Sequence, residues 1–435
     1  MRKLGGVPAP HRKNTAHCVP QPIPVPPEVK LSMAMHSGTP ANPVVTTGQY
    51  VKVGQLIGEA DETVSSPVHA SVSGTVKGFD YIDSLTGKKI TSVTIVSDGN
   101  QTLYEGIKPP AVTNLDEFLD AVKNSGAVGL GGAGYPTSHK LKLRDYSKLD
   151  YILVNGMECE PYVTSDTRTM VDDAGYVYEG ARLLREFLKP KRIIICIENN
   201  KPEAIKKLRS ICKNGVEVRA YASLYPRGER KVLVHNVTGR TVPEGARLTD
   251  VGCIVINCTT VATIAKYIKT GMPLVSKYVT VDGSAVREPK NVIAPIGTPV
   301  RYLFDFCGGL RDDVKKIILG GPMMGAAIPN LDVPVKKVTG AVLAFSEKDS
   351  NPPESSACIR CGRCVSKCPI GLMPPFIENA YELEKPGLLM KYRVYMCAEC
   401  GCCAYLCPAK RPLVQVLALA RIMLKNYMAE QKEAK

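Results

Sequence analysis

The sequence predicts a multidomain protein of the α/β and β classes, in which a β sandwich, an α/β domain, a small mixed domain and a mostly helical, cysteine-rich domain follow one another. Short β-branched runs between glycines fill the first hundred residues, a rhythm typical of a compact sandwich or barrel. Helix and strand patterns alternate from residue 111, and a cysteine pattern occurs twice after residue 350. A length of 435 residues leaves room for about three or four domains.

Residues 1–110 make up the predicted sandwich. The proline-rich segment Pro20–Pro27 cannot be helical and is expected to lie extended across another domain. The β-rich runs 43–58 and 64–76 resemble the two halves of a biotinyl/lipoyl type of domain. The stretch between the halves, 59–63, carries no lysine, so a swinging-arm role is not expected. His69 is interpreted as a packed residue rather than a metal ligand.

Residues 111–271 make up the predicted α/β domain, in which Asn114 caps a helix that runs through Lys123. The strands expected next are 151–154, 192–197 and 253–256, and the helices are 183–189, 202–213 and 261–269. Ligands of α/β sheets bind at the carboxyl ends of the strands, so polar residues that follow these strands are candidates for a binding site.

A glycine-rich loop, Gly129–Lys140, precedes the first of these strands. Glycines let the backbone approach a flat or anionic ligand closely, and free N–H groups there can hold phosphate. The loop is neither a G-x-G-x-x-G fingerprint nor a Walker loop, so it is weak evidence by itself. The candidate cofactor-binding residues are Gly129, Gly131, Gly132, Gly134, Lys140, Asn155, Glu158, Glu160, Gly228, Glu229 and Asn257.

Residues 272–346 are expected to form a small mixed domain, with strands 275–281, 292–297 and 316–319 and a helix from Val300. A polar hinge, 347–353, leads into a mostly helical domain, 347–435. The terminal helix 413–432 has an apolar side that we expect to face the core rather than a membrane.

The duplicated cysteine pattern is the most specific motif of the chain. Each run has the spacing C-x2-C-x2-C-x3-C-P, in which three thiolates grip one cubane cluster and the fourth cysteine ligates the other cluster. The predicted ligands are Cys358, Cys361, Cys364 and Cys407 for the first 4Fe-4S cluster, and Cys397, Cys400, Cys403 and Cys368 for the second.

Structural zinc is the competing interpretation, but zinc sites usually pair two CxxC knuckles about 12–20 residues apart. Two runs of four account for half of the 16 cysteines, and Cys402 is interpreted as a passenger inside the second run. Free thiols together with oxygen-sensitive clusters indicate a reducing compartment.

Composition and charge exclude several classes of protein. The formal net charge of +15 is spread along the chain, and there is no tryptophan, so a nucleic-acid platform is not expected. The start, Met1–Gly6, has no apolar segment typical of a signal peptide, and no apolar run approaches the roughly 18–20 residues that span a bilayer. Any association with a membrane is therefore expected to be peripheral.

Together these segments resemble a known family. Gly129–Lys140 and Asn155–Pro161 are similar to the flavin loop and the asparagine–acidic segment of the NADH-oxidising flavoprotein subunit of respiratory complex I, and Asn257 matches an asparagine lining its flavin. Leu130 and Met157 stand where that family has an arginine and an aspartate. The whole order, from the Gly5-Gly6-Val7 start to Gly320–Gly325 and the paired clusters, resembles the RnfC family of the Rnf complex, the ion-pumping ferredoxin:NAD oxidoreductase.

The resemblance implies FMN and NAD(H) as cofactor and substrate, and it implies a lipoyl-like sandwich at 1–110, an FMN/NAD(H) domain at 111–271, a β-grasp domain at 272–346 and a double-cluster ferredoxin-like domain at 347–435. It also implies other Rnf membrane and cluster-bearing subunits as partners, ferredoxin as an indirect one, and a peripheral position at the cytoplasmic face of the membrane. A flavin would join two-electron hydride chemistry to one-electron clusters, so we expect no catalytic side chain.

Two alternatives remain open. The chain could be a soluble NADH-dependent donor to another reductase, or a cluster scaffold without a working flavin, given Leu130 and Met157.

The crossed ligation yields a direct test. Cys368→Ala is expected to damage the second cluster, although Cys368 belongs to the first run. Electron paramagnetic resonance of the reduced variant reports which cluster signal is lost. Loss of the Cys358–Cys364 cluster alone would contradict the assignment, and two zinc ions without iron would exclude electron transfer.

Overall fold

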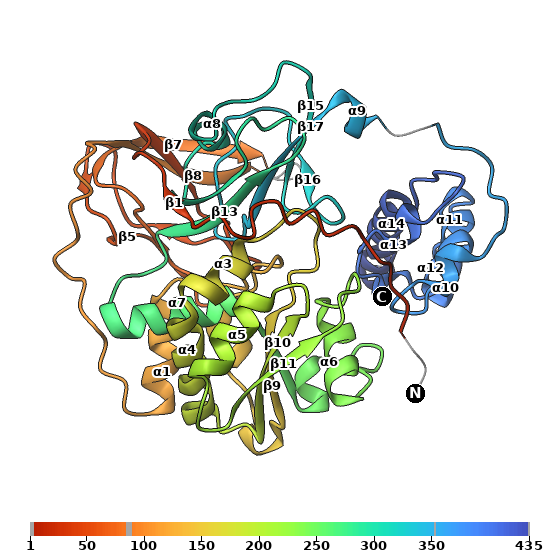
Figure 1. The fold of residues 1–435 in the computed structure, drawn as a ribbon, viewed down its shortest axis with the longest axis horizontal. Helices are drawn as coiled ribbons and strands as arrows, with labels where there is room; N and C mark the ends of the chain where they lie inside the picture. Colours follow the sequence, from red (N-terminus) through yellow and green to blue (C-terminus); the bar gives the residue numbers. More distant parts are fainter. Residues whose placement is uncertain (1–3, 84–88, 352–353, 434–435) are drawn as a thin grey trace.

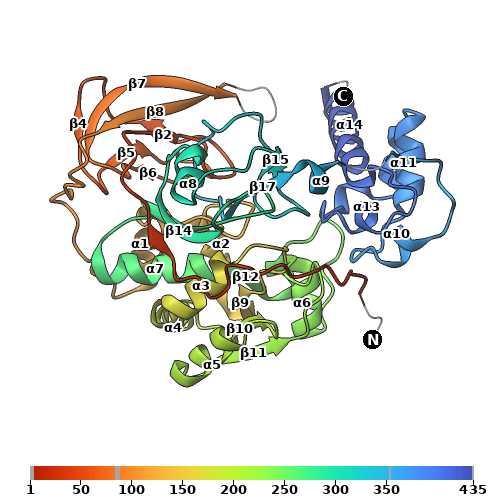
Figure 2. The same ribbon diagram turned by 45° about the horizontal axis from the view of Figure 1, so that its top comes forward.

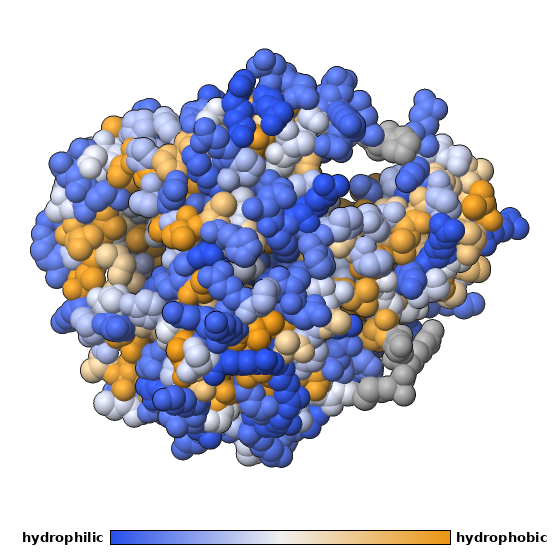
Figure 3. All heavy atoms as spheres, in the orientation of Figure 1, coloured by the Kyte–Doolittle hydropathy of each residue, from blue (hydrophilic) through white to orange (hydrophobic). Residues whose placement is uncertain are grey.

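The computed structural model describes residues 4–83, 89–351 and 354–433. Figure 1 shows a β-rich part and an α/β part packed together, with a mixed sheet between them and a helical part set to one side. The N-terminal segment runs from the helical part across the other parts toward the β-rich part, as the view in Figure 2 also shows. On the face drawn in Figure 3, hydrophobic residues occur in scattered groups among hydrophilic ones, as on most soluble domains.

Two antiparallel sheets form the β-rich part. One has the order β2 (Glu28–Ser32), β8 (Lys89–Ser97), β7 (Gly74–Asp83) and β4 (Tyr50–Val51). The other contains β3 (Asn42–Pro43), β5 (Leu56–Glu59) and β6 (Val68–His69). Short strands between glycine turns bury alternate apolar side chains in a common core.

The α/β part has a four-stranded parallel sheet of order β11 (Val216–Tyr221), β10 (Arg192–Glu198), β9 (Tyr151–Gly156) and β12 (Cys253–Asn257). Alternate strand residues point to opposite faces, so each face has its own core. One core packs under α1 (Leu115–Asn124), α4 (Ala174–Leu188), α5 (Pro202–Ile211) and α7 (Cys258–Thr270), and the other packs under α6 (Arg230–Thr238).

The helix limits mostly follow the sequence prediction. Asn114 caps α1, and its side chain accepts a hydrogen bond from the backbone N–H of Glu117. The predicted start of the next long helix at Leu183 is wrong, because α4 begins at Ala174. Short helix α3 (Ser165–Asp172) was not predicted.

The mixed sheet has six strands in the order β1 (Gln21–Pro22), β14 (Lys290–Pro295), β13 (Ser276–Asp282), β17 (Ala341–Ser346), β15 (Val314–Leu319) and β16 (Ala326–Ala327). Helix α8 (Val300–Phe306) packs on it. Strand β1 comes from the proline-rich segment and pairs in parallel with β14. The prediction that this segment lies extended across another domain is therefore confirmed.

The helical part contains α10 (Arg363–Ser366), α11 (Pro374–Glu382), α12 (Pro386–Lys391), α13 (Cys402–Tyr405) and α14 (Leu413–Glu433). Leu413, Leu417, Ala420 and Leu424 are buried, so this side of α14 faces the core as expected, whereas Met428 is exposed. No described helix is long and apolar enough to cross a bilayer. The predicted hinge includes a short helix, α9 (Glu347–Ser350), while Pro352 and Pro353 lie outside the described residues.

A buried lysine ties three of these parts together. Lys337 follows β16, is 1% exposed, and its ammonium group donates to the carbonyls of Pro67 (2.6 Å) and Gly126 (2.8 Å). Pro67 belongs to the β-rich part and Gly126 to the segment after α1. Burial lowers the pKa of Lys337 to about 7.

This lysine generates a pH test. Between pH 7 and 10.5 the unfolded chain binds a proton that the folded chain has released, so this group makes the free energy of unfolding rise with pH. Lys337→Met should remove that rise. We expect the parent to gain stability relative to the variant from about pH 7 to 10, measured by anaerobic denaturant unfolding, with parallel curves below pH 7. Parallel curves over the whole range would contradict the argument.

Candidate functional site

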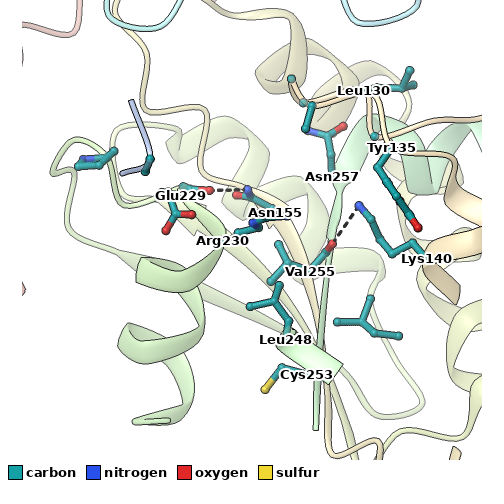
Figure 4. A pocket seen from close by; sticks show the side chains of 18 of the residues that line it. Leu130, Tyr135, Lys140, Asn155, Glu229, Arg230, Leu248, Cys253, Val255 and Asn257 are labelled. Carbon is teal, nitrogen blue, oxygen red and sulfur yellow. Dashed lines mark hydrogen bonds between the residues drawn. The ribbon is translucent and has the colours of Figure 1, made fainter. Parts of the chain in front are cut away.

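A cleft of about 2420 Å³ lies between the α/β part, the mixed sheet and the helical part. It opens at the carboxyl ends of β9 and β12, where parallel sheets hold ligands. Figure 4 shows Lys140, Asn155 and Asn257 along this cleft. Ligand sites usually measure about 300–1,000 Å³. The cleft therefore has room for more than one ligand.

The structure brings nearly all of the predicted cofactor-binding residues to this cleft. Those that line it are Gly129, Gly131, Gly132, Lys140, Asn155, Glu158, Glu160, Gly228, Glu229 and Asn257. Gly134 does not line it, because a Cβ atom there would lie 3.0 Å from Val338 and 3.5 Å from His36. Gly134 thus serves the close packing of the loop against neighbouring parts.

The glycine loop presents its backbone to the cleft. Gly132 has a φ angle of +142°, which favours glycine, and an added Cβ atom would meet nothing within 4 Å. Gly131, in contrast, has no room for a side chain, since a Cβ atom there would lie 2.8 Å from the amide nitrogen of Asn257. The loop thus fits a flat ligand that needs close backbone approach.

The asparagines and Glu229 hold the ends of secondary structure elements at the cleft. Asn155 donates to the Gly228 carbonyl (2.9 Å), a bond drawn in Figure 4. Asn257 caps α7 by accepting from the N–H groups of Thr259 and Thr260. Glu229 caps α6 in the same way, accepting from the N–H groups of Lys231 and Val232. These side chains combine capping with exposure to the cleft.

The two predicted glutamates have different surroundings. Glu158 caps α3, accepting from the N–H groups of Asp166 (2.6 Å) and Thr167 (3.1 Å), and burial raises its pKa. Glu160 accepts from the N–H of Met323 (3.0 Å), and burial raises its pKa to about 7. The sequence did not indicate that Glu160 would join the α/β part to the segment Gly320–Gly325.

Two lysines support the loop that carries both glutamates. Lys13 donates to the carbonyls of Glu158 (2.7 Å), Glu160 (2.8 Å) and Val163 (2.6 Å). Lys201 donates to the Met157 carbonyl (2.6 Å). Sequence reasoning missed both lysines, since neither follows a motif.

Lys140 is the cation of the glycine loop segment. Its ammonium group has one long contact, 3.5 Å, to the Val255 carbonyl on edge strand β12. Burial, with a smaller effect from Arg230, lowers the pKa of Lys140 to about 8. A half-buried ammonium group with so weak a hydrogen bond from the protein is suited to an anionic ligand.

The helical part brings the cysteines of the second run together with one cysteine of the first run. Cys368, Cys397, Cys400 and Cys403 line one small cavity, and burial, with smaller effects from the other three thiols, raises the pKa of Cys403 to about 12. Burial, the largest cause, raises the pKa of Cys397 to about 11. This grouping is the one that crossed ligation of the second cluster requires.

The first-cluster cysteines lie closer to the surface. Cys364 is buried and its pKa is raised, chiefly by burial and also by Cys407 and Cys358, whereas Cys358 and Cys361 are exposed. Within the described ranges, no group of three or more Cys, His, Asp or Glu side chains is arranged to hold a metal ion. A cubane cluster differs from a single ion, because its thiolates bind separate irons at separate corners.

A buried contact seats the second cysteine run on the α/β part. Tyr225 donates from its hydroxyl to the Cys400 carbonyl (2.8 Å), and Val7 exchanges backbone hydrogen bonds with Tyr225 (2.7 and 3.0 Å). Cys402, interpreted above as a passenger, is 1% exposed and packs in the same cluster as Val7 and Tyr225. Its role in this structure is packing at the contact.

Four family models match the chain in order. They are the RnfC barrel sandwich hybrid domain over residues 1–100, the Nuo51 FMN-binding domain over 122–266, the SLBB domain over 278–327 and a 4Fe-4S dicluster domain over 353–408. In the proton-translocating ferredoxin:NAD(+) oxidoreductase complex of Clostridium ljungdahlii, the subunit designated C is 38% identical over 86% of this chain and 83% of its own length. The chain belongs to this RnfC family.

Other members have similar identity. The corresponding subunit of the Na(+)-translocating ferredoxin:NAD(+) oxidoreductase complex of Acetobacterium woodii is 39% identical over 85% of both chains. That of the ion-translocating oxidoreductase complex of Rhodobacter capsulatus is 35% identical over 85% of this chain and 73% of its own. A chain of NAD+-reducing [NiFe]-hydrogenase aligns with a TM-score of 0.49 at 17% identity, covering 72% of this chain and 63% of that one.

The two departures from the complex I pattern are packing residues in this RnfC-family chain. Leu130 is 3% exposed and packs in the core of the β-rich part, although it also borders the cleft. Met157 is fully buried in the core beneath α6. The cleft therefore lacks an arginine and an aspartate at these positions.

The open space beside Gly132 gives a test of the loop. Gly132→Val is expected to abolish FMN binding, because the side chain would enter the cleft. Gly78→Val is the matched control, since Gly78 has a similar φ of +157° and equally open surroundings on β7. Both clusters should survive in both variants. Flavin retained in the Gly132 variant would mean that the loop is only a tight turn.

Proposed function

We propose that this chain exchanges hydride with NAD(H) through FMN held in the cleft, and passes single electrons through two 4Fe-4S clusters within an ion-translocating ferredoxin:NAD+ oxidoreductase complex. One observation carries the proposal. The cleft lined by the glycine loop also reaches Cys397, Ala398 and Glu399 of the second cysteine run. A flavin site and a cluster site therefore share one cavity.

The residues proposed to hold FMN are those of the glycine loop, together with Lys140, Asn155 and Asn257. Bound FMN would accept a hydride from the nicotinamide and release electrons one at a time. The side chains of Asn155 and Asn257 would orient the ligand, because each is held in place by its own hydrogen bond. The open space beside Gly132 would let the ligand approach the backbone closely. Glu158 and Glu160 shape the side proposed for the nicotinamide.

The geometry favours an order for the clusters. Cys397 lines the cleft, and it shares a small neighbouring cavity with Cys368, Cys400 and Cys403. Cys358 and Cys361 are exposed, and Ile359 between them is 66% exposed. We infer that the second cluster receives electrons from the flavin and that the first cluster passes them to a partner.

The domain limits belong to the same proposal. A lipoyl-like sandwich at 1–110, an FMN/NAD(H) domain at 111–271, a β-grasp domain at 272–346 and a ferredoxin-like domain at 347–435 agree with the positions of the family models. We further propose that the chain is peripheral at the cytoplasmic face of the membrane, held by other subunits of the complex, with ferredoxin as an indirect partner. Co-purification with integral-membrane subunits tests this assembly and would separate it from a soluble donor to another reductase.

The composition of the isolated chain tests the cofactors. Anaerobically purified protein should contain one FMN and about eight iron atoms, as two cubane clusters require. Iron without flavin, even after FMN is added, would support the cluster scaffold that Leu130 and Met157 suggest.

A variant at the Tyr225 contact tests the proposed electron transfer from the flavin to the second cluster. Tyr225→Phe leaves the buried Cys400 carbonyl unpaired, which costs about 1–3 kcal/mol of docking between the two parts. We expect NADH to reduce the flavin at the parental rate and the second cluster to be reduced more slowly, measured by rapid-mixing absorbance and freeze-quench resonance.

Tyr50→Phe is the control, because the Tyr50 hydroxyl donates to the Asp98 carboxylate (2.6 Å) in the β-rich part, outside the lining of the cleft. Equal cluster reduction in the Tyr225 variant and the parent would show that this contact does not set the transfer.

A further inference from the structure

Lys277 lies inside the cleft but comes from outside the α/β part. It is on β13 of the mixed sheet, is 5% exposed, and lines the cleft. Neither the glycine loop nor the strand-end asparagines point to it, since it follows no motif in the sequence.

Among the described residues, the Lys277 ammonium group makes no hydrogen bond and no ion pair, which distinguishes it from the buried lysines Lys201 and Lys337 and from the half-buried Lys13. Lys13 donates to three carbonyls, and Lys337 donates to two carbonyls and to the Ser66 hydroxyl. Lys201 donates to the Met157 carbonyl and lies 3.5 Å from Glu198. Those lysines are satisfied by the protein, whereas Lys277 is not.

Burial of an unpaired ammonium is costly, so a folded protein retains one where a ligand supplies the missing charge. The nearest carboxylate is Asp166, whose oxygens accept from Asn257 (2.7 Å) and Thr259 (2.6 Å). Burial, the larger effect, lowers the pKa of Lys277 to about 8, and Asp166 raises that pKa without pairing with the ammonium group. The charge therefore stays available to the cleft.

A second feature favours an anion at this place. Asn257 and Thr259 begin α7, a helix of 13 residues whose N-terminus borders the cleft. A helix N-terminus carries partial positive charge, and phosphate groups bind there readily. The helix terminus and the unpaired lysine come from different parts of the fold and meet in one cavity.

We propose that Lys277 binds a negatively charged group of the flavin nucleotide, so that the flavin site is built by the mixed sheet as well as by the α/β part. This inference rests on the proposed function. The charged group is either the phosphate or the ring edge that becomes negative on reduction, and the N-terminus of α7 favours the phosphate. With Lys140 on the α/β side, the nucleotide then bridges two parts of the fold.

The test uses the full chain with its clusters intact and its flavin removed, and it measures binding rather than turnover. Lys277→Gln is expected to weaken FMN binding at least tenfold, while Lys277→Arg, which keeps the charge, retains most of the affinity. Lys315→Gln is the matched control, because Lys315 is an exposed lysine on β15 of the same sheet.

Riboflavin, which lacks the phosphate, separates the two sources of charge. If Lys277 binds the phosphate, Lys277→Gln leaves the riboflavin dissociation constant unchanged. If Lys277 binds the ring, the affinities for riboflavin and FMN fall together, and the midpoint potential of the bound flavin becomes more negative. Either result supports the proposal and identifies the group.

A stability measurement separates a ligand-binding lysine from a structural one. Lys277→Met should raise the melting temperature of the flavin-free chain, because it removes an unpaired buried charge, and should reduce the further rise caused by added FMN. A lower melting temperature without flavin, including failure to fold, would overturn the proposal. So would unchanged FMN affinity and potential in Lys277→Gln. A parent chain that binds no FMN would instead overturn the proposed function.

Discussion

The contact that seats the Cys397–Cys403 loop on Tyr225 is the constraint on which the function depends. Electron tunnelling weakens steeply with distance, so the cysteine loop must be held against the cleft. The Tyr225 hydroxyl has one proton, which it donates to the Cys400 carbonyl at 2.8 Å. Gly5 and Val7 complete the contact, since a Cβ atom at Gly5 would lie 2.6 Å from the Cys368 backbone. The N-terminal segment thus fixes a part of the chain that the link after Ser346 alone would leave free.

The residues around the cleft also stabilise the fold, and this explains why their side chains have well-defined positions. Asn257, Glu158 and Glu229 each cap a helix whose N-terminus points toward the cleft. Caps have a single favoured side-chain position, so the groups that would meet a ligand are already ordered. The loop that precedes α3 is strained at Glu158, which has a φ angle of 41°. Lys13 stabilises this strained loop by donating to three of its carbonyls. Replacing such residues would change both the folding of the chain and the binding of a ligand.

Local sequence patterns predicted the local structure and much of the candidate site. The cap at Asn114, the strand ends at Asn155 and Asn257, and the open backbone at Gly132 each depend on neighbouring residues, and each lies where the pattern indicated. The remaining site residues depend on contacts between distant segments. Lys13 reaches a loop about 145 positions away in the chain, and Cys402 meets Tyr225 at a similar separation. No spacing rule encodes such contacts, and for the same reason Lys277 could be found only once β13 was placed beside the cleft.

The cleft combines two cations near the glycine loop and α7 with a carboxyl group near the cysteine loop. In the part of the chain that the structure describes, Lys140 and Lys277 have no carboxylate partner, so the end near the glycine loop and α7 is suited to anions. Toward the cysteine loop, Glu160 lies 3.5 Å from the Tyr225 hydroxyl, whose proton is already committed to Cys400. Burial raises the pKa of Glu160 to about 7, although the hydrogen bond from the Met323 N–H and the nearby Tyr225 hydroxyl favour its charged form. Near neutral pH the Glu160 carboxyl is therefore only partly ionised, which lowers the cost of placing an electron beside it.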